Sequence, residues 1–324
     1  MTADPPIERR HPDRPLVLAV LGPTATGKSA LALALAERHA GEIVNCDSTA
    51  VYRGFDIGTD KVPPEERQGI PHHVVDVAGP TEEYTAARYA QDASAAIRAI
   101  LARGHLPIVT GGTGLYYRAV TRGLFPGPGK DAGLRARLDR SADRRSEGWL
   151  HRMVRRVDPA SAARIQPRDR KRLIRALEVY FLTGVPLTAH FAATVSPLDF
   201  CEVVSLALRL PAAATAERVA RRVDRQFARG IVREVEALLA SGVPRAARPF
   251  GGLVYRQVLE LIDGVRDEAA TRALIVRENR RYARRQLIWF RKEPNLGWLD
   301  GPGEAPEVIA RVDRALSRLR KAPS

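Results

Sequence analysis

The feature that most constrains the fold of this chain is a phosphate-binding loop, the P-loop. Its residues match the pattern G-x-x-x-x-G-K-[ST] at every position: Gly22-Pro23-Thr24-Ala25-Thr26-Gly27-Lys28-Ser29. The apolar run Leu16–Leu21 before it predicts a strand, and Ser29–His39 after it predicts a helix. In that context, backbone N–H groups converge on phosphate oxygens at the helix N-terminus. The sequence therefore predicts a phosphate site, in which Lys28 adds a charge and the Ser29 hydroxyl suits Mg²⁺.

Two further apolar segments also end in polar or glycine residues. Glu42–Cys46 predicts a strand that ends at Asp47, and Leu106–Thr110 predicts a strand that ends in the glycine cluster 111–114. A predicted helix, Thr85–Arg103, lies between them. Alternating strands and helices indicate an α/β fold with a doubly wound parallel sheet. Such sheets bind ligands at the carboxyl ends of their strands, where these polar residues fall.

The composition changes after the breaker cluster Phe125–Gly129. Residues 135–175 have a helical pattern and contain 14 Lys or Arg against 5 Asp or Glu. A strand at Val203–Leu210 then returns to the core, followed by helices at Thr215–Ser241 and about Glu268–Lys292. We therefore predict these parts: a disordered tail at 1–15, a discontinuous P-loop core with C-terminal helices at 16–125 and 201–300, a helical insertion at 126–200, and a loose tail at 301–324.

Net charge and cysteine content narrow the class of protein. The chain of 324 residues has a formal net charge of +15, which favours a polyanionic partner such as nucleic acid. Cys46 and Cys201 are its only cysteines, so a disulfide framework or multi-cysteine zinc site is excluded and a reducing cytoplasm is expected. No apolar stretch reaches the roughly 20 residues that a membrane crossing needs.

The P-loop alone does not identify the phosphate compound. An ATP-binding kinase or ATPase usually has an acidic residue at the end of a second apolar strand to hold Mg²⁺. The strand Leu106–Thr110 ends without a carboxylate. Asp47 could take the metal role, and it is equally placed to act as a base beside the phosphate.

Several motifs together resemble the tRNA dimethylallyltransferases, also called tRNA isopentenyltransferases. They occur in the order of that family and span about residues 16–292. The matching blocks are the P-loop, Asp47–Thr59, His72–Asp76, Gly111–Tyr117, Arg172–Tyr180, Gly230–Gly242 and Arg281–Arg291.

The resemblance implies a reaction and roles for particular residues. Dimethylallyl diphosphate would alkylate the exocyclic N6 amine of the adenine 3′ of the tRNA anticodon, with Mg²⁺ present and diphosphate released. Asp47 would be the general base and Thr113 would hydrogen-bond near the reacting amine. The diphosphate would be held by the P-loop and by Arg218, with Arg222 as a second candidate. A carboxylate suits the base role because the amine becomes acidic as the new bond forms.

A second set of residues is expected to contact the anticodon stem-loop. Arg277, Arg281, Arg284 and Arg285 share one face of a predicted helix. The full predicted set is Asp47, Ser48, Thr49, Ala50, Thr113, Arg135, Lys171, Arg172, Leu173, Ile174, Arg175, Arg281, Arg284 and Arg285. The target adenine would leave its stack in the loop to reach the base and the allyl group.

Two positions depart from the family pattern. Ala50 stands where the family often has Gln, and Gly251–Arg256 matches the family's Gly-Tyr-Lys/Arg block only loosely.

The alternatives to a tRNA dimethylallyltransferase are a small-metabolite kinase, an enzyme that prenylates free adenine nucleotide, and a nucleotide-regulated RNA-binding protein. The expected protein is a cytoplasmic monomer that binds tRNA and dimethylallyl diphosphate and no membrane.

Overall fold

The computed structural model describes residues 11–125 and 127–321. Residues 1–10 of the predicted N-terminal tail and the last three residues of the predicted C-terminal tail lie outside this part of the chain. The described chain forms two compact units: one extends up to Thr121 and resumes at Pro197, and the other is Arg122–Ser196. The sequence pattern predicted the insertion at 126–200.

The first unit is built on a six-stranded sheet with the strand order β3-β2-β4-β1-β5-β6. Every neighbouring pair is parallel, which confirms the predicted doubly wound sheet. The strands are β1 (Leu16–Leu21), β2 (Gly41–Asn45), β3 (His72–His73), β4 (Leu106–Gly111), β5 (Glu202–Arg209) and β6 (Leu296–Asp300).

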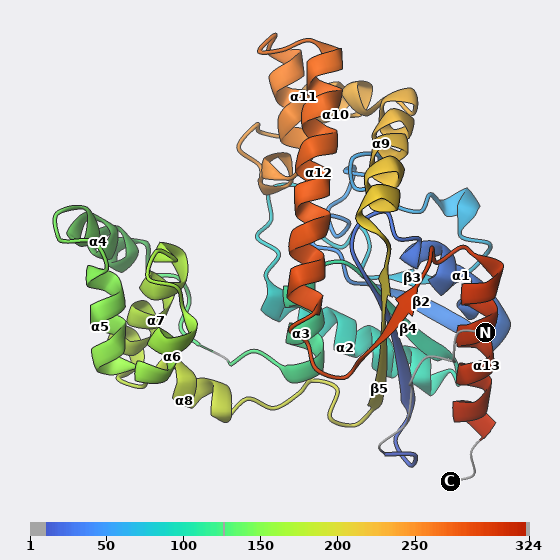
Figure 1. Ribbon diagram of the computed structural model, residues 1–324, viewed down its shortest axis with the longest axis horizontal. Helices are drawn as coiled ribbons and strands as arrows, with labels where there is room; N and C mark the ends of the chain where they lie inside the picture. The colour runs from blue at the N-terminus through green and yellow to red at the C-terminus, as the bar shows by residue number, and fades with distance from the viewer. Residues whose placement is uncertain (1–10, 126, 322–324) are drawn as a thin grey trace. The chain divides into compact units, whose positions relative to one another are not determined.

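Helices cover both faces of the sheet (Figure 1). Side chains alternate along β1, so Leu18 contributes to one core cluster and Val17 to the other. The Leu18 side packs against α1 (Lys28–His39) and α13 (Pro306–Lys321). The Val17 side packs against helices that include α2 (Ala86–Ala102), α3 (Gly114–Arg122) and α12 (Glu268–Phe290).

The C-terminal segment predicted to be a loose tail is α13, so that prediction is wrong for the described residues. Val308, Val312 and Leu316 are spaced four residues apart and lie at most 1% exposed. They pack beside α1, to which Asp313 is also joined by an ion pair with Arg38 and a hydrogen bond with His39.

The remaining helices of the first unit follow β5. The segment predicted as helical at Thr215–Ser241 forms two helices, because Gly230 between them takes the left-handed φ of 89°. These helices and the short 3₁₀ turns are η1 (Pro64–Glu66), α9 (Ala212–Ala228), α10 (Ile231–Ala240), η2 (Arg248–Gly251) and α11 (Tyr255–Ile262). Within the described ranges, no helix has the length and apolar character to span a bilayer.

Among its described residues, the regular elements of the second unit are all helices, and they enclose an apolar core of their own. Its helices are α4 (Ala132–Asp143), α5 (Trp149–Val157), α6 (Pro159–Arg164), α7 (Arg170–Thr183) and α8 (Leu187–Ala192). Glu178 on α7 is completely buried and accepts two hydrogen bonds from the guanidinium of Arg135 on α4, at 2.8 and 2.7 Å. Arg175 donates a further bond at 2.7 Å. This buried carboxylate therefore joins two helices of the unit.

Candidate active site

The P-loop connects β1 to α1 and turns sharply at its glycines. Gly27 has φ 84°, and a Cβ there would lie 2.0 Å from the Oε2 atom of Glu304, so a larger residue would be strained and crowded. The Thr26 hydroxyl donates to the Pro23 carbonyl at 2.9 Å, which closes the turn. Lys28 begins α1 immediately after this turn, as the motif requires.

Two cavities lie at the P-loop. The first has a volume of 380 Å³ and is lined by Lys28, Ser29 and Asp47 among others. The second has a volume of 420 Å³, and it shares Lys28, Ser29, Asp60 and Arg222 with the first. The strand-end position predicted for the site is therefore where the cavities lie.

The second cavity is strongly basic. Four arginines of α9 line it together with Lys28 of the P-loop: Arg218, Arg221, Arg222 and Arg225. They share one helix face because Arg221 and Arg222 follow Arg218 by three and four residues, and Arg225 follows them by four and three. This cavity has the charge and the backbone donors that a diphosphate needs.

Arg218 and Arg222 are held against the P-loop by its own polar groups. Arg218 donates from Nε to the Ala25 carbonyl at 2.6 Å and pairs through Nη1 with Glu304 at 2.6 Å. Arg222 donates from Nη1 to the Thr24 hydroxyl at 2.8 Å. Both arginines named from the sequence thus lie in the second cavity.

The electrostatic environment of Lys28 differs from that of a surface lysine. Burial, followed by repulsion from Arg222, lowers the pKa of Lys28 from 10.5 to about 8, against the opposing attraction of Asp47 and Asp60. A bound anion would therefore stabilise the charged form of Lys28.

Asp47 is fixed at the carboxyl end of β2 by its neighbours. The Asn45 side chain accepts from the Asp47 backbone N–H at 3.0 Å and donates to the Asp47 carbonyl at 3.1 Å. The Asp47 carboxylate accepts the Thr49 backbone N–H at 2.8 Å through one oxygen. One oxygen thus anchors the carboxylate while the side chain lines the first cavity.

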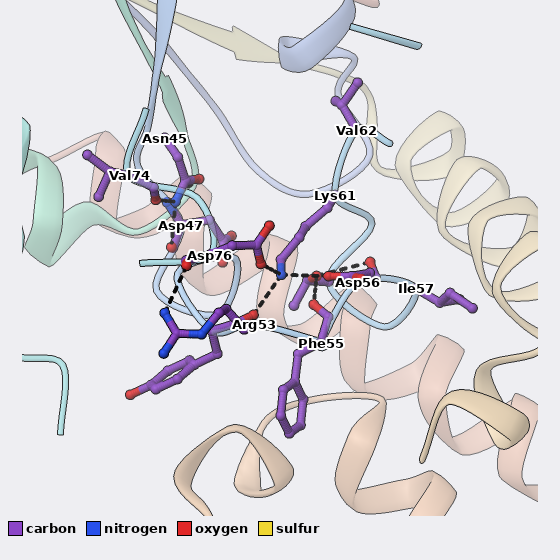
Figure 2. A network of polar contacts seen from close by, with 12 residues as sticks. Asn45, Asp47, Arg53, Phe55, Asp56, Ile57, Lys61, Val62, Val74 and Asp76 are labelled. Carbon is purple, nitrogen blue, oxygen red and sulfur yellow. Dashed lines mark hydrogen bonds and ion pairs between the residues drawn. The ribbon is translucent and has the colours of Figure 1, made fainter. Parts of the chain in front are cut away.

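A buried lysine organises the loops around Asp47 (Figure 2). Lys61 is 9% exposed, and its ammonium donates to Asp76 at 2.5 Å, to Asp56 at 2.7 Å and to the Tyr52 carbonyl at 2.6 Å. These bonds join the loop that follows β2 to the loop that follows β3. Since Lys61 also lines the first cavity, this network shapes the cavity wall.

Thr113, in the loop that follows β4, contacts the two chain neighbours of Asp47. Its hydroxyl accepts the Ser48 backbone N–H at 3.0 Å, and its own N–H donates to the Cys46 carbonyl at 3.1 Å. Thr113 is not among the residues that line the first cavity, whereas Ser48 is. In this structure the Thr113 hydroxyl therefore holds the residue that follows Asp47.

Helix α12 supplies a wall of the first cavity. Asn279, Tyr282, Arg285 and Gln286 of this helix line it, at spacings of three, three and one residues. Burial, followed by the nearby charge of Asp47, raises the pKa of Tyr282 to about 12. Tyr282 therefore stays a neutral phenol beside the Asp47 carboxylate at physiological pH.

Three side chains at the cavities carry oxygen atoms that could hold a magnesium ion. The Ser29 hydroxyl and the carboxylates of Asp47 and Asp60 line the first cavity. Among the described residues, no three His, Cys, Asp or Glu side chains converge to form a metal site. This pattern suits Mg²⁺, which usually takes few protein ligands and completes its shell with phosphate oxygens and water.

The predicted RNA-contacting residues divide by burial. The side chains of Leu173 and Ile174 are 1% and 6% exposed and belong to the core of the second unit, which corrects their assignment as RNA contacts. The guanidinium groups of Arg135 and Arg175 donate hydrogen bonds to the buried carboxylate of Glu178. The residues that remain exposed are Lys171, Arg172, Arg281, Arg284 and Arg285.

Ser48, Thr49 and Ala50 line the first cavity beside Asp47. The sequence patterns did not identify Asp60 and Lys61 as site residues, although both follow directly on the family-like block Asp47–Thr59. They also did not identify Glu304, which lies in the segment taken for a tail and carries no motif.

The chain matches the family described as IPP transferase over residues 50–293. It is 47% identical over 307 residues to a tRNA dimethylallyltransferase of Solibacter usitatus, covering 95% of this chain and 98% of the relative. It is 44% identical over 298 residues to that of Koribacter versatilis, covering 92% and 97%. Among solved structures, the full-length tRNA isopentenylpyrophosphate transferase from Bacillus halodurans is 33% identical with a TM-score of 0.69, covering 94% of this chain and 96% of that one.

Proposed function

Since this chain belongs to the IPP transferase family, we propose that it acts as a tRNA dimethylallyltransferase. It moves a dimethylallyl group from dimethylallyl diphosphate to the N6 amine of the adenine 3′ of a tRNA anticodon. The observation that carries this proposal is that the phosphate-binding Lys28 and the carboxylate of Asp47 line one cavity. A donor diphosphate and an accepting amine can therefore meet there.

The diphosphate of the donor binds in the basic second cavity. Arg218 and Arg222 are held by P-loop atoms, so their remaining N–H groups are preorganised for phosphate oxygens. Lys28 and the P-loop amides add further donors. As the bond between the allylic carbon and the diphosphate oxygen breaks, these groups stabilise the charge that develops on the leaving diphosphate.

The allyl group and the adenine occupy the first cavity. The N6 lone pair forms the new bond to the allylic carbon while the carbon–oxygen bond to diphosphate breaks. The nitrogen becomes acidic as this bond forms, and Asp47 accepts its proton. Because one Asp47 oxygen already accepts the Thr49 N–H, the other is the oxygen that can take the proton.

Magnesium is part of the proposal. The Ser29 hydroxyl, with Asp47 or Asp60 directly or through water, would hold the ion against the diphosphate. When bound, it would neutralise part of the leaving-group charge.

The RNA binds through exposed basic side chains. Arg281, Arg284 and Arg285 of α12 lie on the helix that walls the first cavity, and Lys171 and Arg172 are exposed on the second unit. These cations can contact phosphates of an anticodon stem-loop whose loop bases are already partly unstacked. We also propose that the protein works in the cytoplasm as a monomer.

The test is a transfer assay with mass spectrometry. The protein is incubated with dimethylallyl diphosphate, Mg²⁺ and unmodified tRNA, and the digested RNA is analysed for one added five-carbon unit on an anticodon-loop adenine. ADP formation from ATP and a small metabolite, without any adduct on tRNA, would instead identify a kinase. Transfer to AMP in preference to tRNA would identify a nucleotide prenyltransferase.

A further inference from the structure

The side-chain amide of Gln286 lies between two loops that carry different parts of the site. Gln286 is on α12 and is 6% exposed. Its Oε1 accepts the backbone N–H of Thr24 in the P-loop at 2.9 Å. Its Nε2 donates to the carbonyl of Gly112, in the loop that follows β4, at 2.9 Å. One amide therefore bridges the P-loop and the β4 loop.

The backbone around this bridge is built for close approach. A Cβ at Gly112 would lie 2.4 Å from Gln286 Nε2, and a Cβ at Gly111 would lie 2.1 Å from the Cys46 carbonyl oxygen. Neither position can carry a side chain without displacing these neighbours. The paired glycines thus let the β4 loop fit between α12 and the end of β2.

The contacts continue from Gly112 to the base. Thr113, the next residue, donates its N–H to the Cys46 carbonyl at 3.1 Å and accepts the Ser48 N–H at 3.0 Å. Cys46 and Ser48 are the two neighbours of Asp47 in the chain. A continuous set of hydrogen bonds therefore runs from the P-loop through Gln286 and Thr113 to both sides of Asp47.

We infer that Gln286 is a positioning residue, which fixes the distance between the diphosphate-binding loop and the proton-accepting carboxylate. This inference rests on the proposed function, because it concerns the same reaction. The Gln286 side chain is uncharged, and its amide bonds the backbone of Thr24 and of Gly112. It therefore acts through the positions of these two loops. Its loss should therefore disturb the alignment of the bound substrates more than their binding.

The expected kinetic signature follows from that role. An alignment error of about 1 Å between reacting groups can lower the rate by about a hundredfold. Lys28 and Arg218, which bind the diphosphate, make no hydrogen bond with the Gln286 amide, whose loop partners are the Thr24 N–H and the Gly112 carbonyl. We therefore expect kcat to fall by about ten- to a hundredfold on removal of the amide, while KM for the donor changes by less than about threefold.

The first test compares Gln286→Met with Gln257→Met. Both positions carry a buried glutamine, but in the described chain the Gln257 amide has no hydrogen-bond partner. Gln257 also lies outside the residues that line either cavity. We expect the fall in kcat in Gln286→Met and no such fall in Gln257→Met, with circular dichroism confirming that both variants are folded.

The second test is rescue by protonation in Gln286→Glu. A neutral carboxyl group can accept from Thr24 and donate to Gly112 as the amide does, whereas a carboxylate cannot donate. The ratio of variant to native kcat should therefore rise as the pH is lowered. Using the ratio cancels the titration of groups that both proteins share.

Three results would overturn the inference: an unchanged kcat in Gln286→Met, a loss expressed only as a raised KM, or a flat kcat ratio in Gln286→Glu. Failure of the native chain to transfer any isoprenoid would instead contradict the proposed function. In that case a crystal structure of Gln286→Met tests whether Gln286 acts as a spacer between the P-loop and the loop that follows β4. A wider separation between the Thr24 nitrogen and the Gly112 oxygen than in the native protein supports the spacer role, and an unchanged separation rejects it.

Discussion

At the residue scale, the site joins a strongly cationic pocket to the anchored carboxylate of Asp47. The arginines Arg218 and Arg222 are fixed on the P-loop, and Asp47 is fixed by Asn45 and Thr49. Each group therefore has its orientation before a substrate arrives, which is how preorganised groups lower a reaction barrier.

Replacing Asp47 by Asn tests the assignment of the base. The amide oxygen can still accept the Thr49 N–H, so the loop should keep its shape. The side chain can no longer take a proton, and we expect kcat to fall by about a hundredfold or more while tRNA affinity is largely kept. Single-turnover transfer and filter binding measure the two quantities. Weakened tRNA binding with unchanged turnover would contradict the role of Asp47.

The lowered pKa of Lys28 predicts how donor binding depends on pH. Below its pKa of about 8 the ammonium is charged and attracts the diphosphate, and above that pH the free protein loses this charge. Donor affinity should therefore fall by about tenfold as the pH rises through this range. Calorimetric titration with inorganic diphosphate measures it. Lys28→Met is the control, and it should bind weakly with no step in this range.

At the element scale, Glu42 links β2 to β3 and to the segment between α2 and β4. It lies in β2, is 2% exposed and contacts Arg103, His73 and His105. The Arg103 hydrogen bonds, assisted by the two histidines, lower the pKa of Glu42 from 4.5 to about 2, against the effect of burial. The carboxylate is therefore more stable in the folded protein than in the unfolded chain.

This shift predicts a pH-dependent loss in Glu42→Gln. A depressed acid pKa stabilises the fold above pH 4.5, and the contribution disappears as the pH falls toward 2. We expect the variant to lose about 3 kcal/mol of unfolding free energy at pH 7, because a neutral amide cannot replace the charge-assisted hydrogen bonds that the buried Glu42 carboxylate accepts from Arg103. Urea denaturation should show that this difference shrinks below pH 4.5. An equal difference at every pH would contradict the account.

Helix α13 is the element whose prediction failed. Prolines, glycines and many charged residues hid an apolar stripe at a four-residue spacing, Val308, Val312 and Leu316. Leu316→Ala should lower the unfolding free energy by about 2–5 kcal/mol, and Ser317→Ala by less than about 0.5 kcal/mol. Denaturant titration compares them. Equal small effects would mean that α13 does not belong to the folded core.

The sequence predicted those parts of the site that local chemistry determines. A P-loop needs its glycines and Lys28 at fixed spacing, so the loop, β1 and α1 followed directly. The role of Gln286 was not predicted, because its partners Thr24 and Gly112 are far away in the chain. Arg135 has a cationic side chain that would suit RNA, but only the fold reveals its buried partner Glu178. The spacing of residues along the chain does not reveal hydrogen-bond partners that are distant in sequence.

At the scale of the whole molecule, the net charge of +15 predicts that RNA binding depends strongly on salt. Replacing Arg281 and Arg284 together by Ala should lower the slope of log affinity against log salt by about 0.7 for each phosphate that is no longer neutralised. Arg245→Ala is the matched control, since that exposed arginine pairs with Asp263 away from the cavities. Fluorescence anisotropy with an anticodon stem-loop measures the slopes, and equal slopes would contradict the role of α12.

The central claim is that one cavity brings the diphosphate donor and the adenine amine together beside Asp47. A crystal structure with an unreactive donor analogue and an anticodon stem-loop tests it most directly. The account predicts diphosphate on Lys28 and Arg218, with a free Asp47 oxygen about 3 Å from the N6 atom. An adenine that lies far from Asp47, or a P-loop that takes a nucleoside triphosphate in preference to the donor, would contradict it.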